Sequence, residues 1–251
     1  MYHIPVLLPE SIEALAIKPD GIYVDCTFGG GGHSRAILDR LDHKGRLYGF
    51  DRDKDARENV PHDERFTFVR GNFKHIGNFL RYYGIAHVDG IIADLGVSSH
   101  HFDEAERGFS YRFDGVLDMR MNRNADFTAD KLINNYSEDN LADLLYRYGE
   151  VRTARRIAAA IVRRRQVAPI RTIAELLEVL KPFCSKGKEN KELAPIFQAI
   201  RIEVNAEMDA LKMMLLQSVD LLSKGGRIAV IAYHSIEDRI VKNFLRSGNF
   251  E

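Results

Sequence analysis

The chain has 251 residues, of which 45% are hydrophobic and 29% are charged, in the range of an ordinary globular protein. Its 36 basic and 36 acidic residues give a formal net charge of zero, which excludes any argument for nucleic-acid binding from overall charge and leaves only local patches. Two cysteines without metal-ligand spacing, and the absence of a leader-like start or a membrane-length apolar run, predict a cytoplasmic protein that holds no metal and does not enter a membrane.

The first hundred residues alternate between strand-like and helix-like stretches. Strands are predicted at 21–27, 45–51, 65–71 and 88–96, with helices at 33–42, 52–59 and 74–83 between them. This rhythm predicts right-handed crossovers and a mostly parallel sheet with helices on both faces, so the fold class is α/β and Rossmann-like.

After residue 100 the rhythm changes. An irregular loop over 103–127 precedes helical patterns at 128–147, 150–166, 172–182 and 192–223, and a strand at 225–235 with a helix after it resumes the alternation. We therefore predict an all-helical domain inserted into the sheet domain. The predicted boundaries are 1–104 for the first part of the core, 105–197 for the insert and 198–251 for the second part.

Four consecutive glycines, Gly29 to Gly32, lie between the first strand and its helix, where open parallel sheets bind ligands. A dinucleotide fingerprint G-x-G-x-x-G fails here, because its last position falls on Ser34 or Arg35. S-adenosylmethionine is the other cofactor that such a loop suits.

Acidic residues and one aromatic follow the predicted strands. Asp51 ends the second strand about twenty residues after the loop, where a ribose-binding acid is expected, although an aspartate there could also cap a helix. Asp25 suits loop stabilisation as well as cofactor contact. Phe73 follows the third strand, where an adenine ring would lie, and a core position is the alternative.

Asp94 ends the fourth strand. A carboxylate there can accept an N–H of an exocyclic amine and hold the nitrogen in line with a methyl donor. The motif reads Asp-Leu-Gly-Val and lacks the aromatic that usually stacks on the target base, so Phe102, Phe109, Tyr233 or His234 would have to supply it. A turn-capping aspartate is the alternative. Of the residues after the last strand, His234 is a candidate for touching the base, and Ser235 with Asp238 fits a helix capping box.

The insert is strongly polarised in charge. Eight arginines lie between Arg147 and Arg171, among them Arg163 and Arg164, against the single acid Glu150. Arginine forks bind phosphate well, so the cluster favours RNA contact over a merely solvated helix face. The loop 107–121 adds guanidinium and aromatic groups suited to a splayed base, unless its aromatics fill a core; they include Arg107, Phe109, Arg112 and Arg120.

A series of unusual runs carries a resemblance that spans nearly the whole chain. They are HIPVLL, DCTFGGGGHS, GFDRD, DLGVSS, ERGFSYRFDGVLDMRM, FQAIRIEVNAEM and YHSIEDRIVK, in this order. With them the chain closely resembles the bacterial ribosomal RNA small subunit methyltransferase H family, also called MraW. The resemblance implies an S-adenosylmethionine-dependent enzyme that methylates N4 of a cytidine in the decoding region of 16S ribosomal RNA.

The resemblance also implies a set of cofactor contacts. Matched position by position, they are Gly31, Gly32, His33, Asp51, Phe73, Asp94 and His101. The family often carries glutamine where His101 stands, and it normally continues past Glu251 with edge strands and a basic tail. A methyltransferase with another substrate and a non-catalytic ribosome assembly factor remain alternatives. The sequence leaves the oligomeric state open, a homodimer included.

Overall fold

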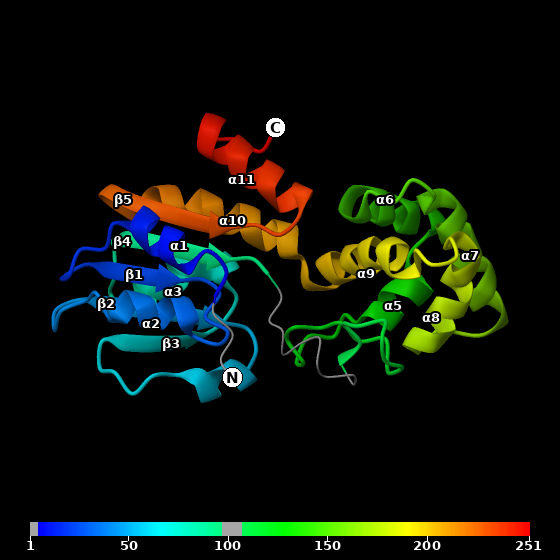
Figure 1. Ribbon diagram of the computed structural model, residues 1–251, viewed down its shortest axis with the longest axis horizontal. Helices are drawn as coiled ribbons and strands as arrows, with labels where there is room; N and C mark the ends of the chain where they lie inside the picture. The colour runs from blue at the N-terminus through cyan, green and yellow to red at the C-terminus, as the bar shows by residue number, and fades with distance from the viewer. Residues whose placement is uncertain (1–4, 97–106) are drawn as a thin grey trace. The chain divides into compact units, whose positions relative to one another are not determined.

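The computed structural model describes residues 5–96 and 107–251. The chain forms two compact units. One, the α/β unit, consists of Met1–Val97 and Met208–Glu251, and the other, the helical unit, consists of Ser98–Glu207 (Figure 1).

A five-stranded, all-parallel sheet is the centre of the α/β unit. Its strands are β1 (Ile22–Asp25), β2 (Arg46–Asp51), β3 (Phe66–Arg70), β4 (Val88–Asp94) and β5 (Leu222–Ile231). They lie in the order β3-β2-β1-β4-β5, so strand order reverses between β1 and β4. The predicted α/β class is confirmed. The reversal matters because ligands of open α/β sheets bind beyond the carboxyl ends of the strands at that point.

Helices cover the sheet. They are α1 (Leu8–Leu15), α2 (Gly32–Leu38), α3 (Ile76–Tyr82), α10 (Glu207–Leu221) and α11 (Ser235–Ser247), with short 3₁₀ turns at Asp55–Asn59 and Phe73–His75. Apolar residues of α1 and α2 share one core with β1, β2 and β4, including Ile12, Ile37 and Leu47. Gln217 of α10 ties that helix to α3 by accepting from the Gly77 N–H at 3.0 Å and donating to the Lys74 carbonyl at 2.7 Å.

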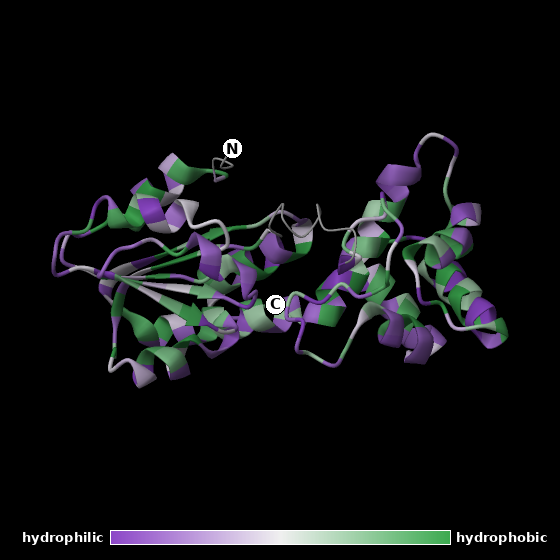
Figure 2. Ribbon diagram, turned by 90° about the horizontal axis from the view of Figure 1, so that it is seen from below, coloured by the Kyte–Doolittle hydropathy of each residue, from purple (hydrophilic) through white to green (hydrophobic). Residues whose placement is uncertain are grey.

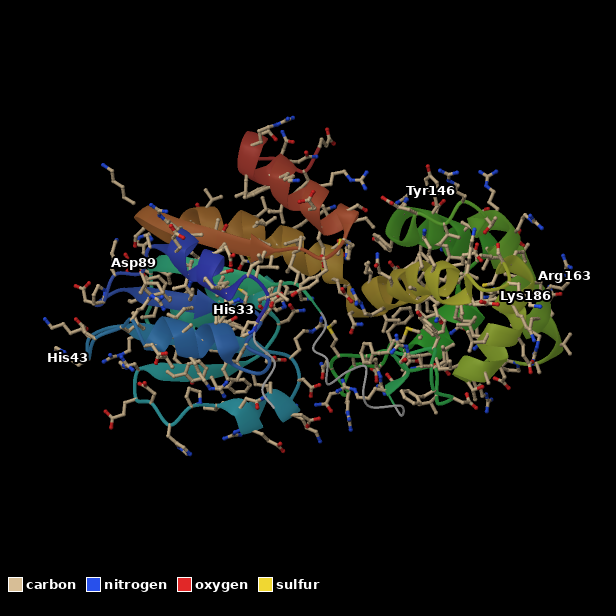
Figure 3. All side chains as sticks on the ribbon, in the orientation of Figure 1. His33, His43, Asp89, Tyr146, Arg163 and Lys186 are labelled. Carbon is tan, nitrogen blue, oxygen red and sulfur yellow. The ribbon has the colours of Figure 1, made fainter. Side chains whose placement is uncertain are left out.

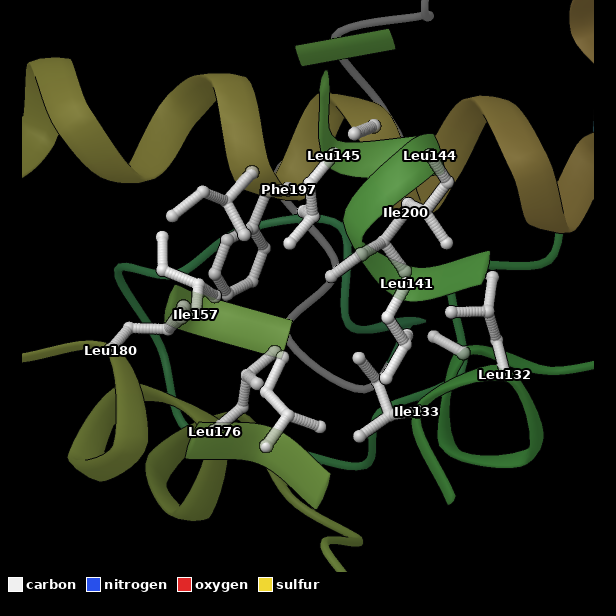
Figure 4. Packing of buried hydrophobic residues seen from close by; sticks show 14 of the residues in the cluster. Leu132, Ile133, Leu141, Leu144, Leu145, Ile157, Leu176, Leu180, Phe197 and Ile200 are labelled. Carbon is white, nitrogen blue, oxygen red and sulfur yellow. The ribbon is translucent and has the colours of Figure 1, made fainter. Parts of the chain in front are cut away.

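The helical unit has a core of its own. Its helices are α5 (Ala129–Asn135), α6 (Glu138–Gly149), α7 (Ala154–Val167), α8 (Ile173–Leu180) and α9 (Glu189–Asn205), with a 3₁₀ turn at Lys181–Phe183. Leucines and isoleucines at helical spacing meet in the centre, as Figure 4 shows for Leu141, Leu145, Ile157 and Ile200. Because this apolar cluster contains only residues of the helical unit, the unit does not borrow its core from the sheet.

Three local features differ from the sequence expectations. The helix α1 is additional, and the stretches predicted as single helices at 128–147 and 192–223 are each broken into two. The first break follows from Ser137, whose side chain caps α6 by accepting from the Asn140 N–H. The second lies at Ala206, which has a left-handed backbone with φ 48°. Since α9 continues to Asn205, the compact helical unit extends past the predicted boundary at 197.

Colouring by hydropathy separates the two faces of most helices in both units (Figure 2). Within residues 5–96 and 107–251, no helix combines the length and the apolar character that crossing a bilayer requires.

Candidate active site

Three aspartates lie at the carboxyl ends of adjacent strands. Asp25 ends β1, Asp51 ends β2 and Asp94 ends β4. The strands are parallel and β1 pairs with both β2 and β4, so all three carboxylates reach the same edge of the sheet, around the reversal of strand order. The structure thus brings together residues that are up to 69 positions apart in the sequence.

Backbone conformation or steric overlap requires glycine at some positions of the loop and not at others. Gly29 and Gly31 have positive φ values of 48° and 74°, which favour glycine. A side chain on Gly32 would overlap the ring of Pro5. Gly30 has an ordinary φ, and no described atom lies within 4 Å of where its Cβ would be. The glycine run is therefore required mostly for the path of the chain.

Asp51 fastens this loop to β2. Its Oδ2 accepts from the Gly29 N–H at 2.9 Å, and its Oδ1 accepts from the Asp53 N–H at 2.8 Å. A carboxylate offers about four lone-pair positions, so a side chain of this kind can serve a diol as well as backbone N–H groups. Asn59 closes the loop from the other side by donating to the Gly29 carbonyl at 3.0 Å.

Asp25 is a buried member of the site, with only 1% of its surface exposed. Its carboxylate accepts from the Ser34 hydroxyl at 2.7 Å and from the Thr27 N–H at 3.0 Å. Burial raises the pKa of Asp25, and these two hydrogen bonds oppose the rise. Since both oxygens are engaged inside the loop, its geometry favours loop stabilisation over direct cofactor contact.

Asp94 and His33 form a pair at the centre of the site. His33, labelled in Figure 3, projects from the start of α2. Its Nδ1 lies 3.8 Å from Asp94 Oδ2, and its side chain is 6% exposed. The backbone N–H of Asp94 donates to the Thr27 hydroxyl at 2.7 Å, which fixes the end of β4 against the glycine loop. His33 Nε2 and Asp94 Oδ1 are buried and have no hydrogen-bond partner among the described residues. Such orphaned polar atoms fit a polar ligand.

His234 has a structural place that the sequence did not reveal. It is the N-cap of α11, where its Nδ1 accepts from the Glu237 N–H at 3.3 Å. Glu237 in turn accepts from the Tyr233 N–H at 3.0 Å. The prediction that Ser235 and Asp238 form the capping pair is wrong, because the cap lies one residue earlier.

Phe73 is half-buried in the 3₁₀ turn after β3. His101 lies outside the described residues, as does Phe102. Residues 5–96 and 107–251 contain no group of three or more histidines, cysteines and acids that could hold a metal ion.

The predicted substrate residues of the loop 107–121 divide into two kinds. Arg107 is 4% exposed and donates to the carbonyls of Arg120 and Met121, and Phe109, also 4% exposed, belongs to the core of the helical unit. Two guanidinium nitrogens of Arg120 donate to the Asp118 carboxylate, at 2.7 Å each. These three residues hold the loop together, which agrees for Phe109 with the alternative that the aromatics of this loop fill a core, whereas Arg112 is exposed.

Some arginines of α7 donate to backbone carbonyls, whereas others are exposed. Arg165 donates to the carbonyls of Ile133 and Tyr136, and Arg164 donates to the Ala168 carbonyl at the end of its own helix. Arg155 and Arg163 are exposed, and Figure 3 shows Arg163 at the outer side of the helical unit. Only part of the arginine cluster is therefore available to a phosphate backbone.

Several site residues gave no signal of their own. Thr27, Ser34 and Asn59 hold the loop and the strand ends by the bonds described above. Short polar residues next to glycines are typical of loops, so the sequence could not separate these three from ordinary turn residues.

A parallel sheet with a glycine loop after β1 and acids at the ends of β2 and β4 defines an α/β methyltransferase of the Rossmann-like class. Within that class the chain belongs to the MraW methylase family, whose model matches residues 1–250.

Relatives of known name support the family. The chain is 61% identical over 251 residues to a Parabacteroides distasonis protein named ribosomal RNA small subunit methyltransferase H, covering all of this chain and 82% of that protein. A Bacteroides fragilis protein of the same name is 59% identical over 250 residues, again with 82% of its length covered. A solved structure of a putative rRNA methylase from Clostridium thermocellum aligns with 47% of this chain and 74% of its own, at 17% identity and a TM-score of 0.34, too distant to add to the assignment.

Proposed function

We propose that the protein transfers a methyl group from S-adenosylmethionine to the exocyclic N4 amine of a cytidine in the small-subunit ribosomal RNA. Family membership supports methyl transfer, and the names of relatives that share about three-fifths of their aligned residues with this chain support ribosomal RNA as the substrate. The single observation that carries the chemistry is Asp94, a strand-end carboxylate with one buried oxygen that has no partner among the described residues.

The residues at the strand ends fit the cofactor. The carboxylate of Asp51, at the end of β2, suits the ribose hydroxyls, and the half-buried ring of Phe73 suits the adenine. His33, whose Nε2 has no hydrogen-bond partner among the described residues, lies in the first turn of α2, directly after Gly31 and Gly32. When bound, S-adenosylmethionine supplies an electrophilic methyl group on a sulfonium.

Asp94 positions the amine. The lone pair of N4 is delocalised into the cytosine ring, so the nitrogen is a poor nucleophile until it pyramidalises. Asp94, held by the Thr27 hydroxyl through its own N–H, accepts one amine hydrogen and keeps the nitrogen aligned with the methyl group. After transfer, the cationic nitrogen is acidic and gives up its proton without a strong base. Hence a carboxylate is sufficient for the proton transfer.

The helical unit is the proposed RNA contact. Exposed cationic groups on α7 and on the loop before α5, including Arg155, Arg163 and Arg112, suit backbone phosphates. We therefore expect the double change Arg155→Gln/Arg163→Gln to weaken RNA binding and to lower its salt dependence, while S-adenosylmethionine binding is retained.

The test of the function is the Asp94→Asn variant. Asparagine keeps the shape of the side chain but not the charge that attracts the amine, so methyl transfer is expected to fall by at least about 100-fold, as when other transition-state stabilisers are removed. Binding of RNA is expected to persist. Mass spectrometry of small-subunit RNA from cells lacking the protein should show the loss of one N4-methylated cytidine. An unchanged modification profile would refute the proposed substrate, and full activity of Asp94→Asn would refute the mechanism.

A further inference from the structure

Tyr233 lies directly beside the proposed catalytic carboxylate. In the register of β4 with β5, Asp94 is paired with Ile231, and the Leu95 N–H donates to the Ile231 carbonyl at 3.0 Å. Tyr233 follows that partner by two residues, in the connection between β5 and α11. Its place is therefore fixed by the same strand pair that fixes Asp94.

Gly96 shows that the ring occupies a defined position. A Cβ on Gly96 would lie 2.6 Å from Cε2, 2.9 Å from Cζ and 3.1 Å from Cδ2 of Tyr233. The φ angle of Gly96 is not in the positive region, so its backbone does not require glycine. The absence of a side chain at Gly96 makes room for the tyrosine ring.

The backbone of Tyr233 is fixed by hydrogen bonding, but its side chain is exposed. The backbone N–H of Tyr233 is bound by Glu237, which is only 2% exposed, and the following residue caps α11. Nevertheless 51% of Tyr233 is exposed, which is unusual for an aromatic side chain with a fixed backbone and a neighbouring catalytic carboxylate. Burial raises the pKa of the Tyr233 hydroxyl, and its interaction with the neighbouring Asp94 carboxylate raises it further.

Two of the other candidate aromatic groups are already engaged. Phe109 is buried in the core of the helical unit, and His234 caps α11 through Nδ1 with only 10% of its side chain exposed, while its buried Nε2 has no hydrogen-bond partner among the described residues. The strand-end motif Asp-Leu-Gly-Val provides no ring of its own. Bases that react at an exocyclic amine are held by stacking on aromatic side chains.

We propose that the exposed face of Tyr233 is the platform on which the target base stacks, while its hydroxyl orients the Asp94 carboxylate that receives the amine. This inference rests on the proposed function, because it assumes that a nucleobase amine is the methyl acceptor. Tyr233 acts as a positioning residue for both the base and the acid. A merely structural cover over Gly96 is the alternative.

Substitutions at Tyr233 separate the ring from the hydroxyl. Tyr233→Leu removes stacking, and kcat/KM for RNA is expected to fall by about 5- to 150-fold, mainly through KM, since this is the range that one lost base–aromatic contact produces. Tyr233→Phe retains the ring and loses the donor to Asp94, so KM should change little and kcat should fall. Tyr82→Leu removes an 83% exposed tyrosine of α3 and serves as the control with unchanged kinetics. Equal losses in Tyr233→Leu and Tyr233→Phe, or no loss in Tyr233→Leu, would overturn the proposal.

A binding measurement tests the platform without methyl transfer. The chain contains no tryptophan, so Tyr233→Trp introduces a single fluorescent reporter. A cytidine-containing RNA fragment should quench its emission by stacking, and the same fragment with an abasic site in place of that cytidine should not. Quenching by both fragments, or by neither, would overturn the proposal. If the unsubstituted protein does not methylate N4 of cytidine, that result would instead refute the proposed function. The two failures are therefore distinguishable.

Discussion

Asp118 fixes the loop that precedes α5. It accepts from the Arg120 N–H at 3.0 Å and from two nitrogens of the Arg120 guanidinium at 2.7 Å each. Asp63 and Arg65 repeat the same arrangement before β3 in the α/β unit. In both places an aspartate two residues before an arginine forms a compact ion pair that shapes a turn.

The Asp118 pair makes the stability of the helical unit depend on pH. Burial alone would raise the pKa of Asp118, but the hydrogen bonds and charge of Arg120 outweigh it and lower the pKa below the ordinary value of an aspartate. A group with a lowered pKa stabilises the fold above its unfolded pKa and loses that contribution as the pH falls through its folded pKa. Asp118→Asn is therefore expected to be less stable than the unsubstituted protein at pH 7, by about 1–2 kcal/mol for a partly exposed pair.

This difference should shrink as the pH falls below about 4, the ordinary pKa of an aspartate in the unfolded chain, and should be lost as the pH passes through the lower pKa of folded Asp118. Urea unfolding followed by circular dichroism at several pH values measures it. Asp63→Asn is the matched variant, because hydrogen bonds from Arg65 lower the pKa of Asp63 in the same way. A stability difference that stays constant from pH 7 to pH 3 would contradict the assignment.

Single residues also show what the sequence could not predict. The acids Asp51 and Asp94 were recognisable because strand ends and spacing place them, and the structure puts both at the expected edge of the sheet. Arg107 and Phe109 look like ligands of a splayed base, yet both are buried. Residue type reveals what a side chain can bind. It does not reveal whether that side chain is buried or hydrogen-bonded within the folded protein.

The elements were predictable where periodicity was strong. All five strands form near the predicted positions, since continuous apolar runs bounded by turn residues are typical of buried parallel strands. The break at Ala206 was not predictable, because alanine is the strongest helix former and the apolar pattern continues across it. Such a left-handed residue is imposed by contacts at a distance, among them Asn205, which donates to the Met119 carbonyl at 2.8 Å.

The glycine loop is the element on which the site depends, and its four glycines are not equivalent. At Gly31 the φ of 74° and a ring carbon of Phe28 3.0 Å from the Cβ position both oppose a side chain. Gly31→Ala is expected to cost about 1–2 kcal/mol in backbone strain and to weaken S-adenosylmethionine binding roughly tenfold as the loop shifts. Calorimetric titration and thermal unfolding measure the two effects.

Gly30→Ala is the control within the same loop. Its φ is ordinary and its Cβ would meet no described atom within 4 Å, so the protein should keep its stability or gain slightly from reduced entropy of the unfolded chain. If Gly30→Ala and Gly31→Ala were equally destabilising, the path of the loop would not be what requires glycine.

At the scale of the whole molecule, each of the two units has an apolar cluster of its own. One lies between the sheet and the helices α1 and α2, and the other lies among α5 to α9. The proposed chemistry is confined to the α/β unit, whereas the exposed arginines of α7 belong to the helical unit. This division predicts that the cofactor and the RNA stabilise different parts of the chain.

Hydrogen exchange can resolve this division. A ligand stabilises only the structure that must be intact to bind it, by about 2.7 kcal/mol at a concentration one hundred times its Kd. Saturating S-adenosylmethionine is therefore expected to slow exchange in the glycine loop and at the ends of β1, β2 and β4, and to leave the core amides of α6 and α9 unchanged. The Asp51→Asn variant, whose ribose acceptor is weakened, should show little slowing at the same cofactor concentration. Equal slowing in both units would mean that they open as one cooperative body, because binding to one unit would then have to stabilise the other.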